Sequence, residues 1–174
     1  MLHPLSSHYI LWFFSKDVHK HSQTGQNDTG DIMKGSKDIL SSILKTTQMG
    51  QIGIRSILKA PLRSSLRTEL VSQLKEYDAI EQEAHGIALS RGWQLKELDP
   101  AVKGMTNMMT MSRLSFGDID SKAAKMMIQG NTRGIIKGFK NLNQFPPSDQ
   151  RVANLAHKLI DFEETNNHQL QGFL

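Results

Sequence analysis

The chain has 174 residues, the length of one domain or of one domain with a short extension. It contains no cysteine, which excludes disulfide frameworks, cysteine-ligated zinc or iron–sulfur sites and thiol nucleophiles. Hydrophobic residues make up 38% of the sequence, enough for a core, but no apolar run approaches the roughly 20 residues that cross a bilayer.

Residues 1–35 differ in composition from the rest of the chain. They hold four of the seven histidines and a short aromatic run from Tyr9 to Phe14, without helical or strand periodicity. The composition changes near Met33. We therefore predict that residues 1–35 are a disordered extension outside the core, that translation starts at Met33, and that residues 36–174 form a helical domain.

Beyond this extension, hydrophobic residues recur every three or four positions, which is typical of amphipathic helices. A first helix is predicted over about 36–59, and Pro61 ends it. A second is predicted over about 64–91, with Gly92 as its C-cap and Trp93 covering its end.

A short methionine-rich helix is predicted over about 100–115. Asp99 is a good N-cap and Pro100 suits the first helical position, so the start signal is strong. The methionines are Met105, Met108, Met109 and Met111. Core packing is the favoured interpretation of these side chains, with an adaptable interface as the alternative.

Two more long helices complete the pattern. The first runs over about 121–142, capped by Asp120 or Ser121, and the second over about 148–172, capped by Ser148. No segment alternates apolar and polar residues over enough positions to predict a strand. The sequence therefore predicts an all-α, antiparallel up-down four-helix bundle with a short extra helix between the second and third long helices.

Gly130, Gly134 and Gly138 repeat every four residues on the 121–142 helix, and each costs about 1 kcal/mol of helix propensity relative to alanine. This spacing predicts close approach of another helix, within the bundle or across a dimer.

Polar residues interrupt each apolar stripe at about the same height. Buried polar groups cost free energy unless they are paired, so we expect these residues to meet in a hydrogen-bonded layer that sets the helix register. The residues expected in the layer are Thr47, Gln51, Tyr77, Glu81, Asn131 and either Glu163 or Asn166.

A metal site is the alternative interpretation of this layer. Carboxylate-bridged di-metal bundles combine one glutamate from each of two helices with Glu-x-x-His from each of the other two. Here the spacing is Glu-x-x-x-His, which still places the glutamate and the histidine on the same helix face. The other two helices, however, offer too few anionic ligands for two iron ions. We expect no cofactor; the alternative is one iron, manganese or zinc ion held by residues drawn from Glu81, His85, Glu163, Glu164 and His168.

The 121–142 helix is basic, and no acidic residue lies between Ser121 and Ser148. Its cations are Lys122, Lys125, Arg133, Lys137 and Lys140. We expect these cations to form a solvent-exposed face whose charge is balanced by Asp161, Glu163 and Glu164. Binding of a polyanion is the alternative.

Parts of the chain resemble a known family. These parts are Gln73-Leu74-Lys75-Glu76-Tyr77-Asp78, Glu83-Ala84-His85, Arg91-Gly92-Trp93 and Gln129-Gly130-Asn131-Thr132-Arg133-Gly134. They resemble ferritin-like four-helix proteins of spore-forming Firmicutes, namely an uncharacterised clostridial group and, more distantly, the spore coat protein F family. The resemblance covers about 36–174 and implies a ferritin-like bundle that forms homo-oligomers.

The sequence carries no phosphate-binding loop, catalytic triad order or paired catalytic carboxylates. We therefore expect a non-catalytic structural or interaction module, cytoplasmic or spore-associated, whose partners are copies of itself or spore and other proteins. A nucleic-acid partner is not favoured, because a net charge of +4 is small. A degenerate metal-binding bundle and polyanion binding are the alternatives.

Overall fold

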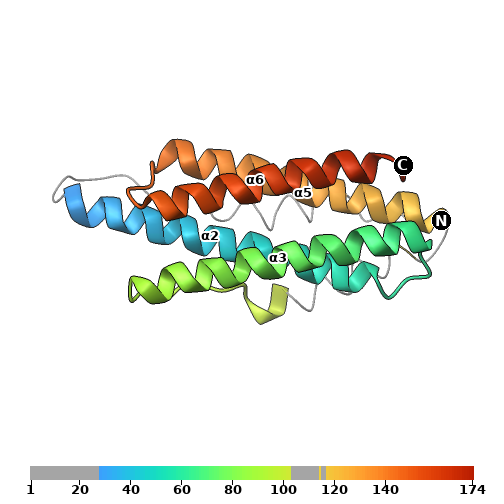
Figure 1. The fold of residues 1–174 in the computed structure, drawn as a ribbon, viewed down its shortest axis with the longest axis horizontal. Coiled ribbons are helices and arrows are strands. Elements are labelled where there is room, and N and C mark those ends of the chain that lie inside the picture. The colour runs from blue at the N-terminus through green and yellow to red at the C-terminus, as the bar shows by residue number, and fades with distance from the viewer. Residues whose placement is uncertain (1–27, 103–113, 115–116) are drawn as a thin grey trace, which may run out of the picture.

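The structure, a computed structural model, describes residues 28–102, 114 and 117–174. Four long helices pack side by side in it (Figure 1). They are α2 (Asp28–Ile57), α3 (Ser64–Ser90), α5 (Ile119–Gln144) and α6 (Gln150–Gln171). A short helix begins at Pro100, between α3 and α5. The predicted all-α four-helix bundle with a short extra helix is therefore confirmed.

Neighbouring helices of the bundle run antiparallel. α2 pairs with α3 and α5 with α6, while α2 also packs against α5 and α3 against α6. In Figure 1, α3 and α5 both run from right to left, so the chain has to return along the length of the bundle between them. The bundle thus consists of two helical hairpins joined by one long crossover.

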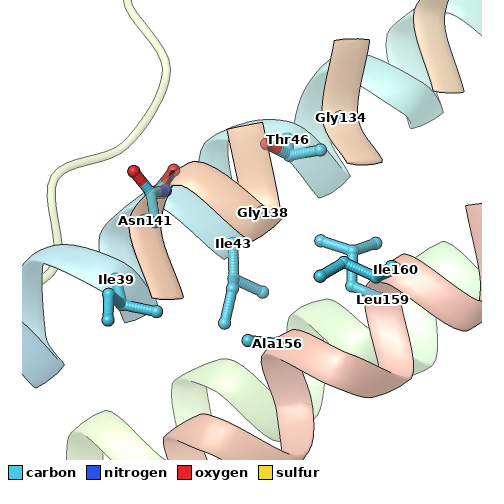
Figure 2. A pocket seen from close by; sticks show the side chains of 10 residues that line it. Ile39, Ile43, Thr46, Gly134, Gly138, Asn141, Ala156, Leu159 and Ile160 are labelled. Atoms are coloured by element: carbon cyan, nitrogen blue, oxygen red, sulfur yellow. Dashed lines mark hydrogen bonds between the residues drawn. The ribbon is translucent and has the colours of Figure 1, made fainter. Parts of the chain in front are cut away.

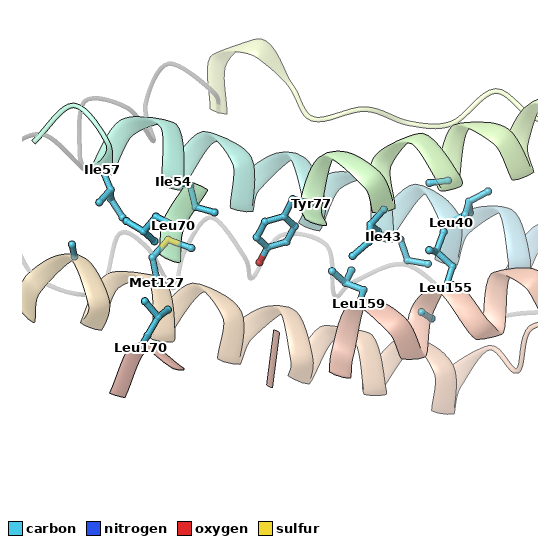
Figure 3. Close-up of a cluster of buried hydrophobic side chains, with 14 of the residues drawn as sticks. Leu40, Ile43, Ile54, Ile57, Leu70, Tyr77, Met127, Leu155, Leu159 and Leu170 are labelled. Atoms are coloured by element: carbon cyan, nitrogen blue, oxygen red, sulfur yellow. The ribbon is translucent and has the colours of Figure 1, made fainter. Parts of the chain in front are cut away.

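The apolar stripes meet between the four helices. Figure 3 shows Tyr77 between two groups of aliphatic side chains. The first group contains Ile54, Ile57, Leu70, Met127 and Leu170, and the second contains Leu40, Ile43, Leu155 and Leu159. Among the described residues, no helix is long and apolar enough to span a membrane.

The start of α2 differs from the prediction. The helix begins at Asp28 instead of near Ser36, so it overlaps the predicted extension. The Ser36 side chain is buried, and its Oγ accepts hydrogen bonds from the amides of Ser148 and Asp149 at 3.1 and 3.3 Å. This contact joins α2 to the start of α6. Residues 1–27 lie outside the described residues, and the start at Met33 stays a prediction.

The predicted cap of α5 was wrong. Asp118, not Asp120 or Ser121, is the N-cap, and its Oδ1 accepts from the Ser121 amide at 3.1 Å. Asp120 is buried instead: its Oδ1 accepts from the Arg63 amide at 3.1 Å, and its Oδ2 pairs with the Arg63 guanidinium. Asp120 therefore links α5 to the α2–α3 connection.

The predicted cap of α6 was also wrong by one residue. Asp149, not Ser148, is the N-cap, and its Oδ1 accepts from the Arg151 amide at 3.0 Å. Its Oδ2 accepts from Arg91 Nε at 2.7 Å. Asp149 thus joins the start of α6 to the end of α3.

The end of α3 follows the prediction. Gly92 has a φ of 63°, and the amides of Gly92 and Trp93 donate to the carbonyls of Leu89 and Ala88 at 3.2 and 2.9 Å. This is a Schellman motif, in which a left-handed residue turns two amides back onto the last carbonyls of the helix. Trp93 is half-buried against the core, as expected.

The start signal of the short helix is confirmed as well. Asp99 Oδ1 accepts from the Ala101 amide at 2.8 Å, and residues 100–102 are helical. The four methionines predicted for this helix lie outside the described residues.

Two of the three α5 glycines face α6 closely. A Cβ at Gly138 would lie 2.8 Å from Ile160 Cγ1, and one at Gly134 would overlap the carboxylate of Glu163. Both glycines line a cavity of about 20 Å³ between α2, α5 and α6 (Figure 2). Gly130 is different, because nothing lies within 4 Å of a Cβ there. The predicted close approach therefore holds at Gly134 and Gly138 but not at Gly130.

We expect Gly138→Ala to be less stable than Gly130→Ala by at least about 1 kcal/mol. Alanine gains about 1 kcal/mol of helix propensity at either position, but at Gly138 the added methyl has to displace Ile160. Urea denaturation followed by circular dichroism measures the difference. Equal stabilisation by both substitutions would contradict the packing at Gly138.

A buried polar layer as the candidate functional site

Three helices contribute to a hydrogen-bonded cluster near the middle of the bundle. Tyr77 of α3 lies with its hydroxyl 3.2 Å from Asn131 Oδ1 of α5 and 3.1 Å from Glu163 Oε1 of α6. All three side chains are buried. The structure therefore brings together Tyr77, Asn131 and Glu163 as the predicted layer requires.

A proton count shows how the cluster is bonded. The Tyr77 hydroxyl has one proton but two acceptors within reach, so it serves only one of them. Burial raises the pKa of Glu163 to about 8, against the opposing effect of the Tyr77 hydrogen bond. At pH 7 Glu163 is therefore mostly protonated, and the Tyr77 hydroxyl donates either to Glu163 Oε1 or to Asn131 Oδ1.

Burial also raises the pKa of Tyr77 well above its ordinary value, and the charge of Glu163 and its hydrogen bond act in the same direction. Tyr77 therefore stays protonated at neutral pH. The cluster is a chain of neutral hydrogen bonds.

Glycines on two helices make room for this cluster. A Cβ at Gly50 of α2 would lie 2.5 Å from Cζ of the Tyr77 ring, and a Cβ at Gly134 would overlap the Glu163 carboxylate. The Tyr77 ring also meets Phe162 edge to face, with centroids 4.9 Å apart. The ring and the carboxyl group are thus held by backbone that only glycine permits.

Three buried side-chain atoms of the layer, Asn131 Nδ2, Asn166 Nδ2 and Glu163 Oε2, make no hydrogen bond with the described residues. Gln73, one turn before Tyr77, donates through Nε2 to Glu69, and its buried Oε1 has no partner among the described residues. The sequence left Glu163 and Asn166 as alternatives, and both are buried. The layer is polar but contributes only one carboxyl group.

Glu81 belongs to a second cluster at the side of the bundle. Its Oε1 accepts from Gln48 Nε2 at 3.1 Å, and its Oε2 accepts from Gln51 Nε2 at 2.6 Å. Gln48 Oε1 in turn accepts from the Leu98 amide at 2.9 Å, which fastens the crossover to α2. Thr47, also predicted in the layer, is buried, but its hydroxyl donates to the carbonyl of Ile43 on its own helix.

The candidate metal ligands do not meet at one point. His85 lies 3.8 Å from Glu81 Oε1 and is exposed, as are Glu164 and His168, whereas Glu163 is buried beside Tyr77. In the part of the chain that the structure describes, no group of three or more histidine, aspartate or glutamate side chains is placed to share a metal ion.

The basic residues of α5 lie on its outer side. Lys125, Arg133 and Lys140 are exposed, and Lys122 and Lys137 are half-buried. Glu163 was expected to balance the charge of these cations, but its carboxyl group lies inside the bundle beside Tyr77.

Gln48 and Gly50 were not identified from the sequence as parts of the site. Gln48 precedes Gln51 by one helical turn, so its spacing could have placed it on the same face. Nothing in the sequence pattern singles out Gly50, because its role depends on the ring of Tyr77 from another helix.

Comparison of the chain with protein-family models, with curated proteins and with solved structures gives no match.

The raised pKa of Glu163 predicts a pH-dependent stability. The folded state keeps the proton up to about pH 8, whereas the unfolded state releases it near the ordinary value of 4.5. The contribution of protonated Glu163 to the stability of the folded state is therefore fully present below about pH 4.5 and is lost as the pH rises towards 8. We expect the free energy of unfolding to fall by on the order of 4 kcal/mol across this window.

Glu163→Gln keeps the shape of the side chain but removes its titratable proton. The fall in the free energy of unfolding between about pH 4.5 and pH 8 should therefore vanish in the variant. Urea denaturation at a series of pH values measures it. Glu164→Gln, at the exposed neighbouring position, is the matched control and should keep the wild-type slope. Identical slopes for wild type and Glu163→Gln would contradict the buried, neutral state of Glu163.

Proposed function

We propose that this protein is a ferritin-like four-helix bundle that acts as a non-catalytic structural or interaction module. The observation that carries the proposal is the Tyr77–Asn131–Glu163 cluster. Its Tyr77 hydroxyl lies within hydrogen-bond distance of both Asn131 and Glu163, between the helices where a catalytic bundle would place its reactive groups. A cluster of neutral hydrogen bonds sets helix register and supplies no nucleophile.

The topology supports the ferritin-like part of the proposal. Ferritin-like bundles contain one long crossover, and here one long connection joins the α2–α3 hairpin to the α5–α6 hairpin. The resemblance of the stretch around Tyr77 and Trp93 to ferritin-like proteins of spore-forming Firmicutes points in the same direction.

The donor set does not fit a di-metal centre. The central cluster offers one carboxyl group, Glu163, and burial holds its pKa at about 8. The other candidate, Glu81, faces the amide donors of Gln48 and Gln51, and these N–H groups occupy both of its oxygens. Metal ions of this class need several deprotonated ligands around one point.

Elemental analysis tests the proposal. The full-length protein, purified without chelator, should contain far less than one equivalent of iron, manganese or zinc, and Glu81→Ala and Glu163→Gln should not change that content. Stoichiometric metal in the wild type that is lost in Glu81→Ala would overturn the non-catalytic assignment in favour of a mononuclear metal protein.

The resemblance also extends the proposal to spores. Immunoblotting of fractionated native cells should find the protein in spores or in the cytoplasm of sporulating cells. Its presence only in growing cells that form no spores would contradict this part of the proposal.

A further inference from the structure

A hollow lies beside the C-terminal end of α3. Gly92 ends the helix in a left-handed turn, and the chain then runs back along the bundle towards the short helix (Figure 1). The amides of Lys96 and Leu98 donate to Ser41 Oγ and Gln48 Oε1 of α2 at 3.3 and 2.9 Å. The returning segment is therefore fastened to α2, and it leaves a hollow of about 460 Å³ against the last turns of α3.

The lining of this hollow is mostly apolar. Ala88 and Leu89 contribute from α3, and Trp93 and Leu95 contribute from the returning segment. Trp93 and Leu95 are half-buried against the core, so the fold holds them in place. Leu89 is 84% exposed, more than any other large apolar side chain of the described residues. A group that filled the hollow would cover this leucine and part of the indole ring.

Glu97 gives the hollow its charge. It is the one acidic residue of the lining, and no lysine or arginine lines the hollow. Its carboxylate is exposed and has no hydrogen-bond or ion-pair partner among the described residues. Two nearby acids of α3 differ in this respect, because Glu81 is bonded to two glutamines and Glu83 to Lys158. Glu97 is therefore available to pair with a cation.

We propose that this hollow binds a small apolar amine as its ammonium ion. The apolar body of the ligand would lie on Leu89 and Trp93, and the ammonium group would pair with Glu97. A carboxylate beside an aromatic ring suits an organic cation, because the face of the ring also attracts positive charge. The volume lies within the range of roughly 300–1,000 Å³ that is usual for small-molecule sites. The inference goes beyond the proposed function, since a non-catalytic module can also carry a ligand site.

Two other occupants agree less well with the same observations. A carboxylate ligand would be repelled by Glu97, and no lysine or arginine of the lining offsets that charge. A second copy of the chain would need roughly 20–30 residues on each side of a stable interface, whereas seven described residues line the hollow.

An NMR titration of the full-length protein tests the proposal. The probe is phenethylamine, and phenylethanol and phenylpropionate are its neutral and anionic counterparts. The amine should give saturable shifts of the amides of residues 85–97 and of the Trp93 indole, with a Kd on the order of 1 mM that rises with salt. The alcohol should bind at least about threefold more weakly, and the carboxylate should not saturate. No saturation by the amine, or equal affinities of amine and alcohol, would overturn the proposal.

Glu97→Gln removes the charge of the hollow and keeps the shape of the side chain. It should weaken amine binding at least about threefold and leave alcohol binding unchanged, because only the amine carries a charge that pairs with Glu97. Glu76→Gln, at an exposed position of α3 outside the hollow, is the matched control and should change neither affinity. Equal effects of the two substitutions would remove the pairing with Glu97 and with it the proposal.

Leu89→Ser tests the apolar part of the site. It should weaken amine and alcohol binding alike, at least about threefold, because both ligands lose the same apolar contact. Ile136→Ser, at a 61% exposed position of α5, is the control and should leave both affinities unchanged. Equal losses of affinity in the two variants would place the binding outside the hollow and contradict the proposal.

Two further results would assign the hollow to another occupant. Sedimentation that shows a dimer dissociated by Leu89→Ser, without amine binding, would assign it to a second copy of the chain. Phenylpropionate that binds more tightly than phenethylamine would assign it to an anionic ligand. Either result overturns the proposal, whereas stoichiometric metal would overturn only the non-catalytic assignment.

Discussion

The hydrogen bonds of Tyr77 are the interaction on which the arrangement of this bundle depends. One phenol from α3 meets an amide from α5 and a carboxyl group from α6, so three of the four long helices share one fixed point. Aliphatic packing alone tolerates sliding of a helix by a turn, because leucine and isoleucine make similar contacts in either register. Sliding any of these three helices would leave buried polar atoms without partners, so the cluster gives the bundle one register.

The fourth long helix, α2, makes no hydrogen bond to Tyr77 in the described structure, but one of its glycines leaves room for the Tyr77 ring. Gly50 of α2 lies against the Tyr77 ring, and Gly134 of α5 lies against the Glu163 carboxyl group. These two glycines allow a large ring and a carboxyl group to lie between helices that are already close. Gly130, one helical turn before Gly134, differs from it because no described atom lies within 4 Å of a Cβ at Gly130.

Charge is distributed differently inside the bundle and on the outer side of α5. Inside, the carboxyl group of Glu163 is mostly protonated at pH 7, because burial raises its pKa to about 8. Outside, the cations of α5 account for the net charge of the protein, while its single acid is bonded to Arg63. The interior of the bundle is thus suited to holding its own register, whereas the positive charge lies on the outside of α5.

Helical periodicity and local start and stop signals were enough to predict the four long helices, the Asp99 cap, the Gly92 end of α3 and the inward positions of Tyr77 and Asn131. These features depend on residues within one or two helical turns of each other, so local sequence patterns are enough to predict them. The pairing of Tyr77 with Glu163, the engagement of Glu81 by two glutamines, the burial of Asp120 and the roles of Gly50 and Gly134 came only from the folded bundle. A helical repeat places a residue on a face but contains no information on the height and rotation of the neighbouring helix, and these decide which polar groups meet.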